Sequence, residues 1–597
     1  MITAARRPDG FLLCPDSPGT ASRAGSHGLT RSYSHAGHTL FYDGREVFVS
    51  GETALFIRGY IVPRNNDYAH CGSTDQAGLA ASLYEKYGRS FTGHIKGYFI
   101  IIIFTGGKIE VFTDQAGLFR AFYRLSEGRL HLASSAGLLM LTGLNPEFDA
   151  VSLGMNALLN RVPLHYTIFR EIFKTTCGDS FCIDESKADR TRYWSPDGLP
   201  AYREESSGPD IDEFADLFRT NTVNFNRFLK PQSGLITLTG GKDSRTILAA
   251  LLGAGLKPTG LTYGNEKSRD AYYAGILAGE AGIRHIVVRP PGTKEWFESE
   301  ASRIIDDLNP EINIHRSHRN YAFALAAEET GRNSAFYTGY LGGELLMGIY
   351  FDDLIFTDFV KTSWETGRIT GIPGRLAACY FKTDGVLTDR ISERISMMKS
   401  MDGNITGRMK AFHGIFEIGI PHHSQDIYLS AGYWDYPYPC FLDTDFLELL
   451  FRSRYSFLRQ DNTTRNPVKR HDLYSLNMRL QHILFPGLDH VPFGKRGSYN
   501  TREYLNGPLC WSVVKGYRYL ADRRMFYPSF AYGESYRLFL IEGLEHAIES
   551  GSSVNDFFDT GRALSDLKVS GALTSEKLLH KYSDIVMFYL LEQKLKR

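Results

Sequence analysis

The chain lacks an excess of charge of either sign: its 67 lysines and arginines are matched by 67 aspartates and glutamates. Nucleic acid is therefore not expected as a main ligand, because proteins that bind it usually carry a basic excess. A long hydrophobic run is also missing. The most apolar stretch, Tyr98–Phe104, is far shorter than the roughly 20 residues that a membrane-spanning helix needs, so we expect no membrane partner and interpret this stretch as a core strand.

Cysteine is sparse: the seven cysteines form an odd, scattered set without CxxC spacing. This pattern excludes a disulfide framework and predicts reduced thiols in a cytoplasmic protein. Arg6 and Arg7 resemble the start of an export signal, but no apolar segment follows them. His422 and His423 lack metal-ligand spacing, so zinc is not expected.

The common phosphate-binding loop is absent as well, since it needs a Ser or Thr directly after its lysine, and here Asp243 follows Lys242. A different glycine turn is present. Residues 235–245 read LITLTGGKDSR, and SRTILAALLGAG continues with the apolar spacing of a helix that ends at Gly253 or Gly255. The pattern predicts a buried parallel strand, a tight turn and a helix.

A glycine turn between a strand and a helix N-terminus suits phosphate. The glycines bring backbone N–H groups against an anion, and the helix dipole is positive at this end. Asp243 adds a hard oxygen ligand suited to Mg²⁺ on that phosphate. The alternative is an ordinary glycine-rich turn without a ligand.

The chain divides into a strand-rich and a helix-rich region. From about residue 38 to 194 short apolar strands alternate with turns, interrupted by one helix, QAGLAASLYEKYG. Residues 195–210 are rich in Pro, Gly and Ser and are interpreted as a linker. Helices dominate afterwards and alternate with strands expected at 235–238, 259–263, 285–289 and 335–338. This alternation predicts a doubly wound parallel sheet, which binds ligands beyond the carboxyl ends of its strands.

The turn TGGKDS resembles the SGGxDS pyrophosphate loop of the N-type ATP pyrophosphatases. Other segments resemble the asparagine synthetase family, which includes β-lactam synthetases and lasso-peptide cyclases, and their order and spacing agree from about residue 38 to 500. These segments are LYEKYGRSFTGHIKGYFIIIIF (83–104), VFTDQAGLFRAFYR (111–124), LHLASSAGLLM (130–140), RYW (192–194), TGYLGGELLMG (338–348) and PYPCFLDTDFLELLF (437–451).

The resemblance implies an α/β fold. It would consist of an N-terminal Ntn-type αββα sandwich-like domain and a C-terminal adenine nucleotide α-hydrolase-like domain with a helical extension. The expected boundaries are 1–194 for the glutaminase-like domain, 195–210 for the linker, 211–510 for the ATP pyrophosphatase domain and 511–597 for the extension.

The resemblance also implies site residues around ATP and Mg²⁺. Asp243 would be the metal ligand, and Tyr340, Lys495 and Glu344 would be the catalytic residues, Tyr340 as a general base with a carboxylate partner that the sequence does not identify. A packing tyrosine and a solvated loop lysine are the alternatives for Tyr340 and Lys495. The expected ATP-binding residues are Leu238, Thr239, Gly240, Gly241, Asp243, Ser244, Tyr263, Thr338 and Gly339.

Two departures from the family bear on function. Glutamine-hydrolysing members begin with a cysteine after the initiator methionine, whereas this chain begins Met1-Ile2-Thr3, and Arg58-Gly59 stands at the glutamine-holding Asn-Gly pair. The first domain is therefore expected to lack glutaminase activity. Gly343 stands where the family usually has an acidic metal ligand, so Glu344 or a water would complete the metal shell.

The leading hypothesis is a Mg·ATP-dependent, AMP-forming ligase that adenylates a small-molecule or peptide carboxylate and forms an amide with ammonia or an amine. An intramolecular cyclase of the β-lactam or lasso-peptide type is the first alternative. A non-catalytic nucleotide-binding or partner-binding protein is the second. Sulfur transfer to tRNA or sulfate activation shares the loop, but it predicts a basic surface and catalytic cysteines that the sequence does not show.

Two weaker features remain. His315, Arg316, His318 and Arg319 could place positive charge near an anionic acceptor, or form a solvated helix start, which we favour. The segment KLLHKYSDIVMFYLLEQKLK predicts an amphipathic helix for packing or for a homo-oligomer.

Overall fold

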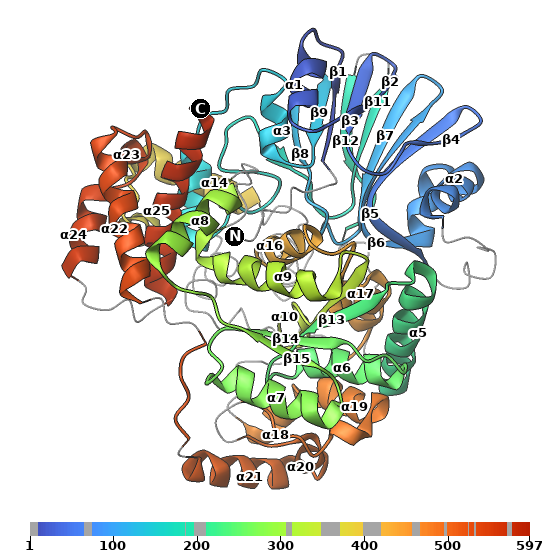
Figure 1. The fold of residues 1–597 in the computed structure, drawn as a ribbon, viewed down its shortest axis with the longest axis vertical. Coiled ribbons are helices and arrows are strands. Elements are labelled where there is room, and N and C mark those ends of the chain that lie inside the picture. Colours follow the sequence, from blue (N-terminus) through green and yellow to red (C-terminus); the bar gives the residue numbers. More distant parts are fainter. Residues whose placement is uncertain are drawn as a thin grey trace.

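The computed structural model describes residues 10–64, 75–184, 187–195, 210–305, 313–347, 371–397, 420–455, 466–494, 498–522, 524–529, 533–569 and 576–596. Two six-stranded antiparallel sheets form the first part of the chain, at the top of Figure 1. One has the order β10-β8-β9-β1-β3-β2 and the other β12-β11-β7-β6-β5-β4. In chain order the strands are β1 Phe11–Pro15, β2 Arg31–His35, β3 His38–Tyr42, β4 Phe48–Ser50, β5 Thr53–Pro63, β6 Ile95–Thr105, β7 Lys108–Thr113, β8 Phe122–Ser126, β9 Arg129–Ala133, β10 Phe173–Lys174, β11 Asp179–Asp184 and β12 Lys187–Arg192.

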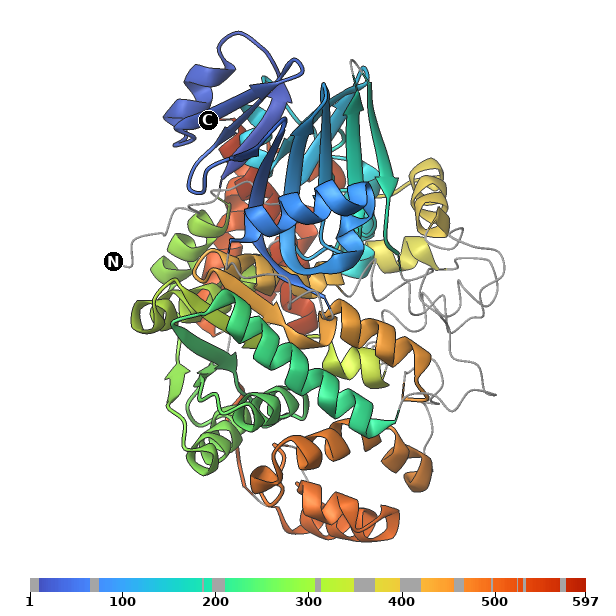
Figure 2. The same cartoon turned by 90° about the vertical axis from the view of Figure 1, so that its right-hand side faces the viewer.

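The two sheets pack face to face through apolar side chains. Phe56 of β5 lies with its ring centroid 5.7 Å from Phe11 of β1 and 5.3 Å from Tyr42 of β3. Helix α2 (Gln76–Tyr87) packs against β5, outside the second sheet, and Figure 2 shows it in front of the strands. Helix α3 (Ala136–Met140) packs on the first sheet. Because a helix layer covers the second sheet, β6 is buried on both faces, which explains its unbroken apolar run.

The second region contains a five-stranded parallel sheet with the order β15-β14-β13-β16-β17. The chain starts at β13 in the centre, runs outward through β14 and β15, and returns to the other side of β13 for β16 and β17. The strand order therefore reverses between β13 and β16. The strands are β13 Ser233–Thr237, β14 Thr259–Tyr263, β15 His285–Val288, β16 Ser334–Thr338 and β17 Tyr436–Pro439.

Helices flank this sheet, and Figure 1 shows α9 above it and α6 and α7 below it. Helix α6 follows β13 directly and has α19 packed beside it. The helices around the sheet are α5 Ile211–Leu229, α6 Asp243–Gly253, α7 Arg269–Ala281, α9 Ser317–Thr330, α10 Gly342–Met347, α16 Ile420–Ala431, α17 Thr444–Arg452 and α19 Ser475–Leu484. Short helices lie further along the chain: α18 Pro467–Asp472, α20 Thr501–Leu505 and α21 Pro508–Ala521.

The C-terminal helices share one core with the first domain. Phe148, just before α4, lies 6.3 Å from Phe557 and 6.2 Å from Phe588 between ring centroids, and Phe297 lies 4.5 Å from Tyr536. The amphipathic C-terminal segment thus packs inside the monomer, as one of its two interpretations predicted. The helices that contribute to this shared core are α4 Ala150–Leu159, α8 Lys294–Ile305, α13 Ile372–Ala377, α14 Gly385–Met397, α22 Glu534–Glu549, α23 Val554–Phe557, α24 Thr560–Val569 and α25 Glu576–Leu595.

A buried ion network joins the first domain to the segment after β17. The Lys96 ammonium lies 2.9 Å from an Asp443 oxygen and 2.5 Å from an Asp445 oxygen. Arg64 adds contacts of 2.8 Å to Asp445 and 2.7 Å to Glu448. All five residues of this network lie at the contact between the first domain and this segment, so removing one of the cations would leave a carboxylate charge poorly compensated away from water.

The expected α/β fold, with a two-sheet first domain and a doubly wound parallel sheet, is confirmed. The strands expected at 235–238, 259–263, 285–289 and 335–338 are observed with ends shifted by at most two residues. β17 was not expected, because Pro437 and Pro439 disfavour a central strand; the structure places it at a sheet edge, where proline is tolerated. The domain boundaries stay predictions, and residues 196–209 of the expected linker lie outside the described residues. Among the helices described, none combines the length and apolarity that a bilayer crossing requires.

Candidate functional site

The site is built on the turn between β13 and α6. Within it the Gly241 N–H donates to the Thr239 hydroxyl at 3.1 Å, and the Thr239 N–H donates to the Ser244 hydroxyl at 3.4 Å. Helix α6 begins at Asp243, so its free N–H groups and positive dipole end lie at the turn. The expected residues Thr239, Gly241, Asp243 and Ser244 are therefore neighbours in one compact loop.

Two other backbone segments approach this loop so closely that side chains are excluded. A Cβ at Gly240 would lie 2.6 Å from the Gly494 Cα, and one at Gly339 would lie 2.9 Å from the Ser244 nitrogen. At Gly342 it would lie 2.8 Å from the Asp243 Cγ. Real carbon contacts need 3.5–4.0 Å, so only glycine fits at these points. The loops after β13 and β16 thus meet at Asp243.

The Asp243 side chain is oriented by Asn477, whose amide donates to Oδ1 at 3.1 Å. Asn477 lies on α19, which packs beside α6. A fixed carboxylate at the mouth of an anion-binding turn is a suitable ligand for a divalent cation. Asn477 carried no signal in the sequence, because it lies more than two hundred residues away.

Arg245 holds the third segment in place. Its side chain is fully buried, its guanidinium lies 4.0 Å from the Phe493 ring, and it donates to the Pro492 carbonyl at 2.9 Å. Burial lowers the pKa of Arg245 to about 9. The Gly494 N–H in turn donates to the Gly240 carbonyl at 2.7 Å. Lys495 follows directly but lies outside the described residues.

Lys242, at the variable position of the loop, points into an aromatic group. Its ammonium lies 4.0 Å from the Tyr474 ring centroid, 5.8 Å from Phe493 and 5.9 Å from Tyr499. Cation–π contacts of this kind stabilise a buried ammonium. Lys242 therefore packs the turn against the aromatic residues next to α19.

An acidic side chain already lies on the turn. Asp270, in the first turn of α7, is hydrogen-bonded to the backbone of Gly240, and burial raises the pKa of its carboxyl while this hydrogen bond opposes the rise. A backbone amide is a donor, so the Gly240 N–H faces a carboxylate of the protein itself. The turn binds an anionic group in this structure, and the sequence did not suggest Asp270.

The loop after β16 carries the other expected residues. Thr338 is buried, and its hydroxyl accepts from Thr237 at 3.3 Å and from the Tyr340 N–H at 3.3 Å. Leu341 has a φ of +64°, a conformation that costs energy for a branched residue and is concentrated at functional sites. Glu344 lies half-buried in the first turn of α10.

Two of the expected ATP-binding residues, Leu238 and Tyr263, differ in exposure. Leu238 is fully buried, and the Thr262 hydroxyl donates to its carbonyl at 2.6 Å, so its side chain belongs to the core of the sheet. Tyr263, at the end of β14, is half-buried and lies 5.8 Å from the His318 ring and 5.6 Å from the Arg319 guanidinium. Both residues lie at the carboxyl ends of their strands, and Tyr263 is the more exposed of the two.

The cluster at the start of α9 is not solvated, so the favoured interpretation was wrong. His315, Arg316 and His318 are buried, because the turn Ile314–Arg316 packs against α8 and α25 while α9 packs against the sheet and α16. Arg316 binds one oxygen of the fully buried Asp426 at 3.1 Å, and Arg319 binds the same oxygen. The other oxygen of Asp426 is buried and has no hydrogen-bond partner among the described residues.

Tyr340 faces this cluster. Burial, followed by the nearby Asp426 and Tyr263, raises its pKa well above the usual value, so the phenol stays protonated at neutral pH. Asp426 is therefore the carboxylate near Tyr340 that the sequence did not identify.

Comparisons with known proteins add little beyond this geometry. No protein-family model matches the chain. One curated relative, "Amidase chry2" of Gibberella zeae, is 24% identical over 243 residues, which is 39% of this chain. The chain spans only about a third (35%) of that relative's length.

Among solved structures, glutamine PRPP amidotransferase from B. subtilis aligns with 11% identity over 57% of this chain and 77% of its own, with a TM-score of 0.22. NMN synthetase from Francisella tularensis aligns with 15% identity over 43% of this chain and 99% of its own, with a TM-score of 0.19. Glutamine-dependent NAD+ synthetase from Acinetobacter baumannii aligns with 12% identity over 47% of this chain and 58% of its own, with a TM-score of 0.19. Overlaps at these scores carry no argument about function.

Proposed function

We propose that the chain is a Mg·ATP-dependent, AMP-forming carbon–nitrogen ligase of the asparagine synthetase type. It would adenylate a carboxylate and form an amide with ammonia or an amine. The observation that carries the proposal is the meeting at Asp243 of the loops after β13 and β16, where the strand order reverses. Open parallel sheets bind their ligands at such points.

The residues present fit a triphosphate with Mg²⁺. Glycines keep side chains out of the turn, α6 directs its positive end at it, and Asp243 offers a hard oxygen. No group of three or more metal-ligating side chains occurs in the described part of the chain. That agrees with Mg²⁺ held by one or two carboxylates and phosphate oxygens, for which Glu344 is the second candidate. When bound, Mg·ATP supplies AMP to the carboxylate and pyrophosphate as the leaving group.

Side chains and backbone N–H groups of the chain would stabilise the negative charge of the phosphates and hold them in position. The Ser244 hydroxyl and the N–H groups at the start of α6 stabilise negative charge on the departing phosphates, and the Lys495 ammonium would add to this. The N–H of Gly240 becomes available when the Asp270 carboxylate moves away. We therefore expect substrate phosphate and Asp270 to compete for the same donor.

Tyr340 and Asp426 would handle the amine. A protonated, buried phenol can donate a hydrogen bond, and the Asp426 oxygen that has no partner among the described residues could accept a proton from the amine. This arrangement serves an amine nucleophile better than free ammonia. The intramolecular cyclase therefore stays the first alternative.

The first domain is proposed to lack glutaminase activity. Arg58, at the position of the family's glutamine-holding asparagine, is almost fully buried, with its guanidinium 4.0 Å from the Phe56 ring. It donates to the Ile57 carbonyl at 3.2 Å and also to the Asp43 carbonyl. We infer from this that the bulky cation would obstruct a glutamine side chain at this position.

Exchange of labelled pyrophosphate into ATP tests the proposal. Pooled amino acids and small dicarboxylates are supplied with Mg²⁺ to the purified chain, and Asp243→Asn serves as the matched variant because it keeps size and the Asn477 contact. We expect exchange with at least one acid and a loss of at least a hundredfold in the variant. ATP binding without exchange for any acid would favour the non-catalytic alternative.

A further inference from the structure

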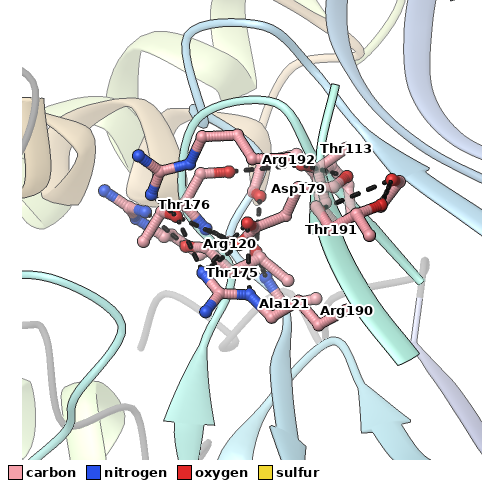
Figure 3. Close-up of polar contacts among 11 residues, drawn as sticks. Thr113, Arg120, Ala121, Thr175, Thr176, Asp179, Arg190, Thr191 and Arg192 are labelled. Atoms are coloured by element: carbon pink, nitrogen blue, oxygen red, sulfur yellow. Dashed lines mark hydrogen bonds and ion pairs between the residues drawn. The ribbon is translucent and has the colours of Figure 1, made fainter. Parts of the chain in front are cut away.

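The first domain contains a second cationic centre, remote in sequence from the nucleotide turn. Arg120, Arg190 and Arg192 gather around the segment Thr175–Thr176, as Figure 3 shows. Arg120 lies just before β8, and the other two lie on β12. Two arginines of β12 and one from the segment that leads into β8, in the other sheet, therefore donate to neighbouring residues of one segment.

The hydrogen bonds fix how closely the groups lie. Arg190 and Arg192 both donate to the Thr176 hydroxyl, at 3.2 and 2.9 Å, so their donating nitrogens lie within two hydrogen-bond lengths of each other. The Arg120 guanidinium donates to the adjacent Thr175 carbonyl at 2.6 Å. Like charges this close repel unless an anion lies between them.

One of the arginines is balanced by a carboxylate of the protein. Asp179 binds Arg190 through both of its oxygens at 2.9 Å, and it also accepts from the Thr176 N–H at 2.7 Å and the Thr176 hydroxyl at 3.0 Å. The Asp179 carboxylate is thus saturated by these two residues.

Arg120 is the residue that points to a ligand. It is 3% exposed, and its Nε–H has no partner among the described residues. Asp114, whose carboxyl feels the charge of Arg120, accepts hydrogen bonds from the N–H groups of Leu118 and Phe119 at 2.8 and 2.7 Å. A buried guanidinium whose N–H group makes no hydrogen bond lowers the stability of the fold, and a bound oxyanion would accept that hydrogen bond.

The surroundings strengthen the positive potential. Burial, and then Arg190, Lys174, Arg192 and Arg394, lower the pKa of His165 to about 3. Several cations thus surround this neutral imidazole. Arg190 remains about a fifth exposed, so the centre is reachable from solvent.

We propose that Arg120, Arg190 and Arg192 form a binding site for an oxyanion, the phosphate or carboxylate group of a small ligand, separate from the nucleotide turn. The planar fork of a guanidinium matches both groups in a bidentate manner. The ligand would bridge Arg120 to the β12 arginines and thereby tie the two sheets of the first domain together at this end.

Thermal unfolding and calorimetry of the full chain test the site, with inorganic phosphate and succinate as probes and sodium chloride matched for ionic strength. We expect one or both probes to raise the melting temperature by a few degrees and to give a saturable heat. A response to phosphate alone identifies a phosphate-bearing ligand, and a response to succinate identifies a carboxylate.

Arg120→Gln and Arg192→Gln should abolish the shift, the second variant serving if the first folds poorly. Arg124→Gln is the control, since Arg124 lies on β8 and pairs with the exposed Glu171 at 3.0 Å. Asp243→Asn should keep the response, which separates this site from the nucleotide turn. No shift with either probe, or equal shifts in the Arg120, Arg192 and Arg124 variants, would overturn the proposal.

Discussion

Gly240 gives the sharpest test of how the turn is built. In Gly240→Ala the new Cβ would lie 2.6 Å from the Gly494 Cα and 2.9 Å from the Tyr273 Cβ. Carbon atoms prefer 3.5–4.0 Å, so the segment around Gly494 must move by about 1 Å. Overpacking of this kind costs about 1–3 kcal/mol. Weakening of the 2.7 Å bond from the Gly494 N–H to the Gly240 carbonyl adds about 1 kcal/mol.

Gly241→Ala is the matched control in the same turn. Its Cβ would lie 3.1 Å from the Thr239 hydroxyl oxygen, with no other atom of the described residues within 4 Å, so a small shift of that side chain relieves the contact. We expect its free energy of unfolding to stay within about 0.5 kcal/mol of the parent. Urea unfolding should therefore separate the two alanine variants by about 2–3 kcal/mol. Equal stabilities would refute the close approach of the two backbones.

Other perturbations have equally definite outcomes. Asp270→Asn removes the acid that competes for the turn, so we expect ATP to bind at least threefold more tightly in calorimetry. Lys96→Met leaves Asp443 buried without its cation and leaves Asp445 with Arg64 alone, which should lower the free energy of unfolding by about 3–5 kcal/mol. Burial raises the pKa of Asp584 to about 8. The unfolded chain loses this proton at lower pH than the folded chain, so stability falls as pH rises from about 4 towards 8, and Asp584→Asn should flatten that fall in melting temperature.

Each of these has its own control. Lys108→Met removes an ion pair with Asp184 in which both side chains are half exposed, and it should cost less than about 1 kcal/mol. Weaker ATP binding by Asp270→Asn would mean that the acid supports the turn instead of competing for it. Parallel pH profiles for the parent and Asp584→Asn would contradict the assigned proton.

The parts of the fold that the sequence predicted are those with a local signal. The apolar run before Gly240 and the helical spacing after Ser244 specify β13 and α6 by themselves. β6 was equally plain, because a strand buried on both faces is apolar throughout. β17 was missed because its two prolines oppose a strand wherever the edge position is unknown.

The site shows the limit of local signals. Asn477, Arg245 and Asp426 gain their roles from contacts with segments far away in the chain, and single-sequence patterns carry no such distances. The arginines of α9 were misjudged for the same reason. A charged helix start is usually solvated. Here α16 packs against α9 and places Asp426 in the core, where it pairs with Arg316 and Arg319.

A crystal structure with Mg²⁺ and a non-hydrolysable ATP analogue tests most directly whether the turn after β13 binds the triphosphate. We expect the phosphates to lie against residues 239–244, the metal to bind the Asp243 carboxylate, and the Asp270 side chain to have moved away from Gly240. Nucleotide bound elsewhere, or an unchanged turn with Asp270 still in place at saturating analogue, would contradict it.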